Sequence, residues 1–197
     1  PETDHLRGLV YILENFRVNC LIKNPDQRKT VLYCALMTAA RDRNIPVIVV
    51  DRFPLEMTFG TAGLTFLGPR LAHGSLNDNS LVFRLCFQDF SILFTGDIFT
   101  LREERLCTLY PGQIRSRVLL APHHGSATSS GKIFLDKVRP HSVIIPCGWR
   151  NRYGFPHPAV LDRYRLRQVD IFRTDLDGAV TVISQGRDFI ITTYKDR

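Results

Sequence analysis

The sequence predicts a mixed α/β fold, and three patterns carry that prediction. Apolar residues recur at helical spacing over 7–16, which indicates an amphipathic helix. A strongly apolar strand over 47–51 is expected to be buried on both faces. Two strand-like runs over 80–87 and 90–95 flank Gln88-Asp89, which is typical of a hairpin. Helices that alternate with strands at the start, followed by hairpins, favour a layered α/β domain.

The remaining elements follow from the same patterns in chain order, with Gly, Pro and Asn at their boundaries. Thr100 and Glu103 have the spacing of a capping box, which predicts the start of a helix over 101–109. We expect further helices over 29–42, 130–138 and 158–168, and strands over 17–22, 56–60, 63–67, 117–121, 142–146, 169–173, 179–184 and 189–194. No repeat or long linker divides the chain, so residues 1–197 are predicted to form one domain.

The composition is that of a folded globular chain. Of the 197 residues, 44% are hydrophobic and 23% are charged, which excludes disorder and a disulfide-dense mini-protein. The apolar runs are far shorter than the roughly 20 residues of a membrane-spanning helix, and no signal-peptide pattern precedes the first helix. Because the chain opens without Met and enters its first helix almost at once, we expect a fragment of a longer protein.

The chain is basic, with a formal net charge of +7. Between residues 139 and 173, seven arginines stand against two aspartates. Interleaved with them are the aromatic residues Trp149, Tyr153, Phe155 and Tyr164. Basic residues can contact a phosphate backbone while aromatic rings stack on unpaired bases, so this segment predicts a nucleic-acid partner. The alternative is a solvated basic face above aromatic core residues.

Imidazole and carboxylate side chains gather where the predicted elements begin or end. Three groups follow strands and one precedes the first helix: Asp97; His123 and His124; Asn151 to His157; and Glu2, Asp4 and His5. Brought together from separate strand ends, such side chains hold the cations of a hydrolytic metal site. Taken singly, Asp97 also fits a turn or helix cap, and the two histidines also fit a surface loop.

Several of these strings resemble a known family. Asp4-His5 resembles the end of the HxHxDH signature of the metallo-β-lactamases. Five further strings, at 77–82, 92–97, 121–126, 151–158 and 173–175, resemble in order the soluble domain of ComEC-type DNA-internalisation proteins. The resemblance implies a metallo-β-lactamase αββα sandwich that lacks its first strands and is part of a longer protein of the bacterial cell membrane. The domain would lie on the outer, periplasmic or extracytoplasmic, face.

The resemblance also implies a role for each matched residue. The implied catalytic residues are Asp97, Asp4 and His124. The implied metal ligands are Glu2, Asp4, His5, Asp97 and His123, with His124 as the alternative to His123. The implied substrate-binding residues are Asn79, Ser80, Ser126, Asn151, Tyr153 and His157. Two divalent ions are implied, and the carboxylate-rich ligand set favours Mn²⁺, with Zn²⁺ or Mg²⁺ as alternatives. Two residues depart from the family: Glu2 stands in place of the second His of the signature, and Phe155 in place of a His in the YGHP string.

The implied function is that of a metal-dependent nuclease, a phosphodiesterase that degrades DNA during uptake and transformation. Its partners would be the phosphate backbone of DNA and the membrane channel portion of the same parent chain. Two alternatives follow from the same residues. One is a non-catalytic DNA-binding module whose metal site has decayed, and the other is a small-molecule hydrolase of the same fold.

Overall fold

The computed structural model describes residues 3–51, 54–68 and 75–196, with residues 3 and 4 described by their backbone alone. The chain packs as two compact units, Pro1–Arg52 and Phe53–Arg197. The expectation that residues 1–197 form a single domain of a longer membrane protein stays a prediction. Among the described residues, no helix has the length and apolar character that crossing a membrane requires.

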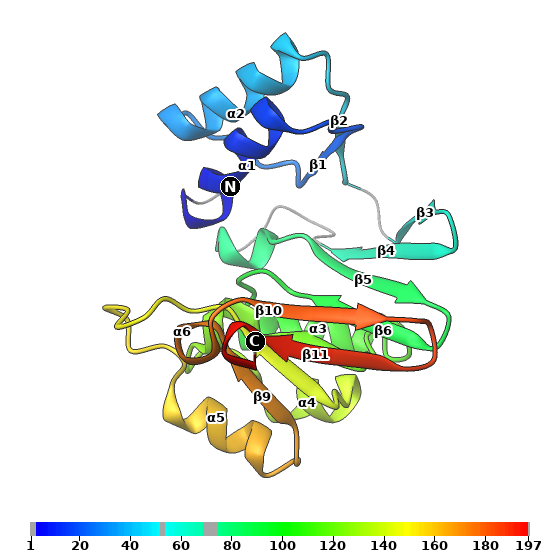
Figure 1. The fold of residues 1–197 in the computed structure, drawn as a ribbon, viewed down its shortest axis with the longest axis vertical. Coiled ribbons are helices and arrows are strands. Elements are labelled where there is room, and N and C mark those ends of the chain that lie inside the picture. The colour runs from blue at the N-terminus through cyan, green and yellow to red at the C-terminus, as the bar shows by residue number, and fades with distance from the viewer. Residues whose placement is uncertain (1–2, 52–53, 69–74, 197) are drawn as a thin grey trace. The chain divides into compact units, whose positions relative to one another are not determined.

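The first unit combines two helices with two short parallel strands (Figure 1). Its elements are α1 (Thr3–Asn15), β1 (Leu21–Lys23), α2 (Val31–Asp42) and β2 (Val47–Val49). Thr30 caps α2, because its side chain accepts the backbone N–H of Tyr33 at 3.3 Å. The buried side chains of this unit include Leu6, Leu13, Leu21, Tyr33, Leu36, Ala40 and Ile45.

Two details of the first unit differ from the sequence prediction. The helix over 7–16 is confirmed, but it begins at Thr3. The prediction rested on the spacing of Leu9, Ile12, Leu13 and Phe16, and of these only Leu13 is buried, on the same face as Leu6. The run over 47–51 was predicted to be buried on both faces, and this is wrong for Val49, which is 47% exposed. The physical reason is that, among the described residues, β2 pairs with β1 alone, and a sheet this narrow leaves side chains such as Val49 open to solvent at its margins.

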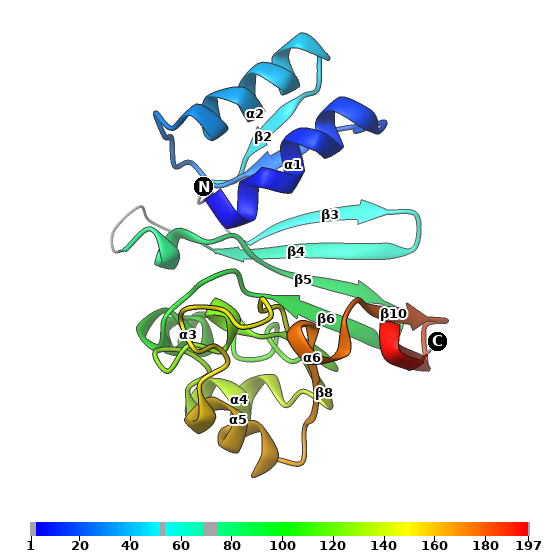
Figure 2. The same cartoon turned by 60° about the vertical axis from the view of Figure 1, so that its left-hand side comes forward.

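The second unit is built around a seven-stranded mixed sheet, part of which is seen strand beside strand in Figure 2. In spatial order its strands are β3 (Leu55–Phe59), β4 (Ala62–Gly68), β5 (Val82–Phe87), β6 (Phe90–Phe94), β7 (Val118–Leu120), β8 (Ser142–Ile145) and β9 (Asp170–Arg173). Pairing is antiparallel from β3 to β6 and parallel from β6 to β9. The hairpin predicted around Gln88-Asp89 is therefore confirmed.

Different layers cover the two faces of this sheet. The helices α3 (Thr100–Leu109), α4 (Lys132–Val138) and α5 (Pro158–Arg165) pack on one face. The hairpin of β10 (Val180–Ser184) and β11 (Phe189–Thr193) packs on the other and lies in front of the sheet in Figure 1. Successive strand residues point to opposite faces, so Leu93 packs toward the helices while Ile92 packs toward the hairpin. The predicted α/β class, with a large mixed sheet, is confirmed.

Short turns and one short helix complete the unit, and the predicted capping box is wrong. The turns are Asn77–Asn79, Pro122–Gly125 and Tyr194–Asp196, and α6 (Thr174–Asp177) follows β9. Phe99, without a side-chain hydrogen bond, is the N-cap of α3. Glu103 points inward instead, where its carboxylate accepts the N–H groups of Ser130 and Gly131 at 2.5 and 2.7 Å. These donors precede α4, so Glu103 stabilises the start of α4 rather than that of its own helix.

Candidate metal centre

The parallel half of the large sheet brings the predicted site segments to one edge. Because β6, β7, β8 and β9 run parallel, their carboxyl ends meet at the same edge of the sheet. Asp97 follows β6, and the two histidines follow β7. The loop 146–157 follows β8, and α6 follows β9.

Backbone contacts hold Asp97 in position. The preceding Gly96 has φ +57°, and a Cβ atom at that position would lie 2.5 Å from the Cβ of Ser80, so the site requires glycine there. The hydroxyl of Ser80 accepts the backbone N–H of Asp97 at 3.0 Å. The carbonyl of Gly96 accepts the N–H of His123 at 3.1 Å, which ties the end of β6 to the histidine turn. The Asp97 side chain is buried, with 8% of its surface exposed.

His124 is the histidine of the doublet that lies beside Asp97. Its Nε2 is 3.6 Å from Oδ1 of Asp97, and its Nδ1 is 2.7 Å from the carbonyl oxygen of Pro146. A carbonyl oxygen can only accept, so Nδ1 carries the proton and donates it. In the neutral ring this leaves the lone pair on Nε2, directed toward Asp97. A histidine whose second nitrogen is held by a carbonyl in this way is the usual form of a metal-binding imidazole.

His123 has different surroundings. Its ring contacts those of Phe99 and Phe155 edge-on, at centroid distances of 5.1 and 5.7 Å. Its Nδ1 is buried and makes no hydrogen bond within the described residues. Both histidines have positive φ, 48° for His123 and 54° for His124, an uncommon conformation for residues other than glycine. Such backbone geometry is most often found at functional sites, and here it turns the two adjacent rings toward different neighbours.

Most of the other residues predicted to bind substrate also make structural contacts. Ser80 holds the backbone of Asp97, as described above, and Asn79 is buried in the turn before it. The hydroxyl of Ser126 is 3.0 Å from that of Thr128. His157 caps α5, where its Nδ1 accepts the N–H of Ala159 at 3.2 Å. Tyr153, by contrast, is 63% exposed at the surface.

The N-terminal candidates belong to the first unit, whereas Asp97 and His124 belong to the second. Glu2 lies outside the described residues, and of Asp4 the structure describes only the backbone, in α1. His5 is exposed on the same helix. Their roles as metal ligands stay predictions.

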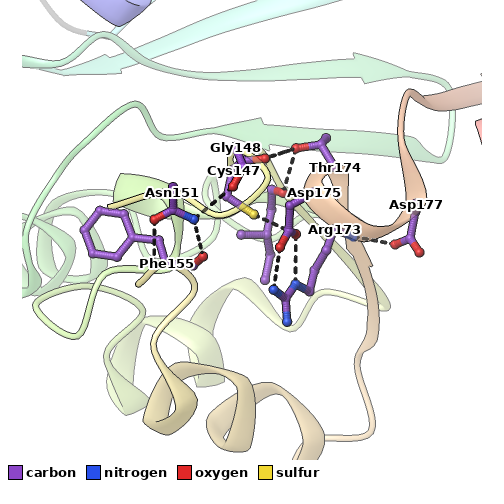
Figure 3. Close-up of polar contacts among 9 residues, drawn as sticks. Cys147, Gly148, Asn151, Phe155, Arg173, Thr174, Asp175 and Asp177 are labelled. Atoms are coloured by element: carbon purple, nitrogen blue, oxygen red, sulfur yellow. Dashed lines mark hydrogen bonds and ion pairs between the residues drawn. The ribbon is translucent and has the colours of Figure 1, made fainter. Parts of the chain in front are cut away.

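The loop 146–157 is held by hydrogen bonds within itself and to the segment after β9, as Figure 3 shows. The Asn151 amide donates to the carbonyls of Gly148 and Phe155 at 3.0 and 2.7 Å and accepts the N–H of Phe155 at 2.9 Å. At the start of the loop, the Thr174 hydroxyl accepts the N–H of Cys147 at 2.9 Å and donates to its carbonyl at 2.8 Å. Asn151 was predicted to touch substrate, and its amide here closes the loop.

A partly buried ion pair extends this anchor. The Cys147 thiol donates to Oδ1 of Asp175 at 3.0 Å, and Arg173 binds both carboxylate oxygens of Asp175, at 3.0 and 2.6 Å (Figure 3). Burial, followed by the hydrogen bond to Asp175, raises the pKa of Cys147 to about 11, so the group remains a neutral thiol near pH 7. Burial opposes ionisation of Asp175, but the hydrogen bonds from Arg173 and Cys147 outweigh it and lower the pKa of this carboxyl.

Sequence reasoning missed two anchors of the site. One is the bonding of Thr174 to Cys147, which joins residues far apart in sequence and leaves no local pattern. The other is Glu103, which shares a helix face with Leu106 and Cys107, all three of them buried. The sequence did carry a signal for this: Glu103 is three and four residues before Leu106 and Cys107, which places its carboxylate on the buried face of the helix. Ser129, next to the segment that Glu103 holds, donates its hydroxyl to the carbonyl of Pro122 at 2.8 Å, and this bond fixes the histidine turn.

The arginine-rich segment is only partly a free basic face. Six of its seven arginines bond to the protein: Arg139 to the carbonyl of Asp136, Arg152 to the hydroxyl of Tyr153, Arg163 to the carbonyls of Ser129 and Ser130, Arg165 to Asp162, Arg167 to Asp136, and Arg173 to Asp175. Tyr164, grouped with the stacking aromatics in the sequence, is fully buried, and its hydroxyl lies 2.8 Å from that of Ser130. The interleaved pattern therefore mixes core residues with surface residues.

Comparison with known proteins finds several relatives of this chain. The chain is 40% identical over 104 residues to Competence protein ComA of Neisseria gonorrhoeae, which covers 53% of this chain and 15% of that protein. It is 27% identical over 200 residues to ComE operon protein 3 of Bacillus subtilis, covering 98% of this chain and 25% of that protein. The chain is homologous to the ComEC-type competence proteins. A third relative, Recombination protein 2 of Haemophilus influenzae, is 36% identical over 92 residues, covering 47% of this chain and 11% of that protein.

The match to the ComEC-type protein of Bacillus subtilis spans both units, since it covers 98% of the chain. The chain spans a quarter or less of the length of these ComEC-type relatives. No protein-family model matches it. A solved structure from Thermotoga maritima, described as a member of the metallo-β-lactamase superfamily, overlaps with a TM-score of 0.38 and 13% identity over 77% of this chain and 80% of the other. At that level of overlap the likeness carries no information about function.

Proposed function

We propose that this chain is the metal-dependent hydrolase domain of a ComEC-type protein and cleaves the phosphodiester bonds of DNA during its uptake. The observation that carries the proposal is the pair formed by Asp97 and His124, with His124 held through its Nδ1 by the carbonyl of Pro146. The names of the relatives, which refer to competence and recombination, support a role in the handling of DNA. The membrane channel portion of a parent chain, and a site on the outer face of the membrane, belong to the same proposal.

The donor groups fit a divalent cation. A buried carboxylate and an imidazole, 3.6 Å apart and at the same edge of the sheet, offer one oxygen and one nitrogen donor. When bound, a divalent cation lowers the pKa of a water molecule and polarises a phosphoryl oxygen. We propose Asp4 and His5 of the first unit, and Glu2, as further ligands of up to two ions, and favour Mn²⁺ over Zn²⁺ or Mg²⁺ because the set is rich in carboxylate.

The residues around the pair would preserve its geometry. The Ser80 hydroxyl holds the backbone of Asp97, and the Pro146 carbonyl holds the ring of His124, so neither donor has to reorganise when a cation binds. Because Pro146 fixes the tautomer, His124 would act as a ligand through Nε2 and not as a proton donor. His123, with its ring packed edge-on against Phe99 and Phe155, would shape the wall of the site.

The test combines metal binding with cleavage. We expect the 197-residue chain to bind Mn²⁺ in an electron paramagnetic resonance titration and to cut DNA in its presence. His124→Gln and Asp97→Asn should each weaken Mn²⁺ binding at least about tenfold, the scale on which perturbed metal sites lose affinity. His123→Phe preserves the edge-on ring contacts and is the matched control, and it should bind Mn²⁺ as the native chain does. Loss of Mn²⁺ binding in His123→Phe but not in His124→Gln would exchange the assigned roles.

One observation favours a second candidate, a DNA-binding module without catalytic activity. The Phe155 ring lies 5.7 Å from that of His123 and 6.5 Å from that of His124, so an apolar side chain stands beside both imidazoles. A site with a phenyl ring in that place would offer fewer donors to a second ion. Salt-dependent DNA binding without measurable Mn²⁺ binding would establish this second candidate and exclude the hydrolase.

A further inference from the structure

The loop between β8 and α5 carries two exposed aromatic rings, each with an arginine over its face. Trp149 is 69% exposed and Tyr153 is 63% exposed. The Arg150 guanidinium lies 4.4 Å from the ring centroid of Trp149, and the Arg152 guanidinium lies 4.8 Å from that of Tyr153. Within the part of the chain that the structure describes, neither guanidinium forms an ion pair with a carboxylate.

Tyr153 also begins a row of three rings that ends at the candidate metal centre. The rings of Tyr153 and Phe155 are stacked, with centroids 5.6 Å apart and an angle of 20° between their planes. The rings of Phe155 and His124 are stacked next in the row, with centroids 6.5 Å apart and an angle of 23° between their planes. His124 then faces Asp97. The exposed aromatic surface is thus continuous with the pair proposed to act on phosphodiester bonds.

The loop that presents these rings is held in one conformation. The Asn151 amide forms hydrogen bonds to Gly148 and Phe155, and the Thr174 hydroxyl forms hydrogen bonds to the N–H and the carbonyl of Cys147. These bonds hold the loop at its start and along its length (Figure 3). His157, at the far end, donates its N–H to the carbonyl of Gly125 in the histidine turn at 2.9 Å. A surface ordered before binding loses little conformational entropy when a ligand arrives.

From these observations we propose that the loop 148–155 is a binding platform for single-stranded DNA. Unpaired bases stack on Trp149 and Tyr153, and Arg150 and Arg152 contact the flanking phosphates. A duplex keeps its bases stacked inside and offers no base face to these rings, so the platform selects unpaired DNA. The inference rests on the proposed function for the choice of DNA as partner, and it adds the form of DNA and the residues that recognise it.

Trp149 makes the test direct, because it is the only tryptophan of the chain. A thymidine oligonucleotide of 12 residues is titrated into the 197-residue chain in the presence of EDTA, and a duplex of 12 base pairs is titrated in parallel. Stacking of a base on Trp149 should quench its fluorescence with the single strand and leave it nearly unchanged with the duplex. Tyr153→Leu should weaken single-strand binding by about 5- to 100-fold, the range found when one stacking residue is removed.

Tyr194→Leu is the matched control, since Tyr194 is another exposed tyrosine, 70% exposed and outside the loop. It should bind the single strand as the native chain does, and circular dichroism melting should confirm that both variants are folded. Equal quenching by the duplex, or unchanged single-strand affinity in Tyr153→Leu, would overturn the inference.

Binding in EDTA also separates this inference from the proposed function. A chain that binds single-stranded DNA through Tyr153 but cuts none with Mn²⁺ keeps the platform and loses the hydrolase. A chain that cuts DNA with Mn²⁺ but shows neither quenching nor dependence on Tyr153 keeps the hydrolase and loses the platform.

Discussion

Replacing Glu103 by Gln is expected to remove a pH dependence of folding stability between pH 4.5 and about 7. The Glu103 side chain is fully buried, and its carboxylate oxygens accept the N–H groups of Ser130 and Gly131. Burial disfavours the charged form and raises the pKa of Glu103 from 4.5 to about 7, against the opposing effect of the two N–H donors and of Arg163. The carboxyl thus titrates in a different range in the folded and in the unfolded chain.

The direction and size of the effect follow from this difference. Between pH 4.5 and about 7 the folded chain keeps the Glu103 proton while the unfolded chain has released it, so raising the pH favours unfolding. At about 1.4 kcal/mol per pKa unit, this group lowers the free energy of unfolding by up to about 3 kcal/mol across the window. The Glu103→Gln side chain does not titrate and should lack this loss.

Urea unfolding followed by circular dichroism at several pH values between 4.5 and 8 provides the assay. The difference in free energy of unfolding between Glu103→Gln and the native chain cancels the titration of the six histidines and should rise in favour of the variant by up to about 3 kcal/mol. Glu104→Gln, the exposed neighbour on the same helix, is the control and should show a flat difference. A difference that falls as the pH rises would refute the reasoning, because it would mean that the N–H donors of Ser130 and Gly131 outweigh burial.

Three further substitutions test the anchors of the site. Gly96→Ala should lower the free energy of unfolding by about 1–3 kcal/mol and weaken Mn²⁺ binding, because Gly96 has φ +57° and the added Cβ would lie 2.5 Å from that of Ser80. Urea unfolding and a Mn²⁺ titration measure the two effects. A native Mn²⁺ affinity in this variant would argue against the turn at Gly96 as the support of Asp97. Asn151→Ala removes the three hydrogen bonds that close the loop 148–155 and leaves Trp149 and Tyr153 in the sequence. Binding of single-stranded DNA should therefore weaken in the fluorescence titration. A native affinity in this variant would show that binding does not require these hydrogen bonds. Thr174→Val removes the hydroxyl that bonds to both backbone groups of Cys147, and it should lower the free energy of unfolding, measured with urea, by about 1–3 kcal/mol. Thr174→Ser keeps the hydroxyl and should be nearly as stable as the native chain. An equal loss of stability in both variants would mean that packing of the methyl group, and not the hydroxyl, is what matters.

The sequence predicted most of the elements because their signals are local. Hydrophobic periodicity located the helices and strands to within a few residues, and Gln88-Asp89 marked its hairpin. The errors occurred where tertiary contacts decide. Glu103 has the spacing of a capping residue, yet the donors that it satisfies belong to Ser130 and Gly131 on a distant segment. Val49 lies in an apolar run, yet its sheet consists of two strands in the part of the chain that the structure describes.

The candidate site divides in the same way. Residue types and their order after strands pointed to Asp97 and the histidine doublet, because parallel strands bring their carboxyl ends to one edge. Which histidine faces Asp97 could not follow from two adjacent identical residues. The positive φ angles of His123 and His124 and the carbonyl of Pro146 decide it, and Pro146 lies within reach of His124 because β8, which it follows, pairs with β7.

The partners of the arginines, like the choice between the two histidines, could not be predicted from the sequence. By itself the sequence determined that the chain is basic, that it has an α/β fold and that it carries imidazole and carboxylate groups at strand ends, because composition and periodicity are properties of the chain read in order. Only the tertiary structure decided that Arg163, Arg165, Arg167 and Arg173 bond to the protein while Arg150 and Arg152 lie over exposed rings. The physical reason is that a side chain's partners are set by proximity in space: Arg163 and Arg167 bond to residues of distant segments, and even the local partners of the other four depend on how the folded backbone orients each side chain.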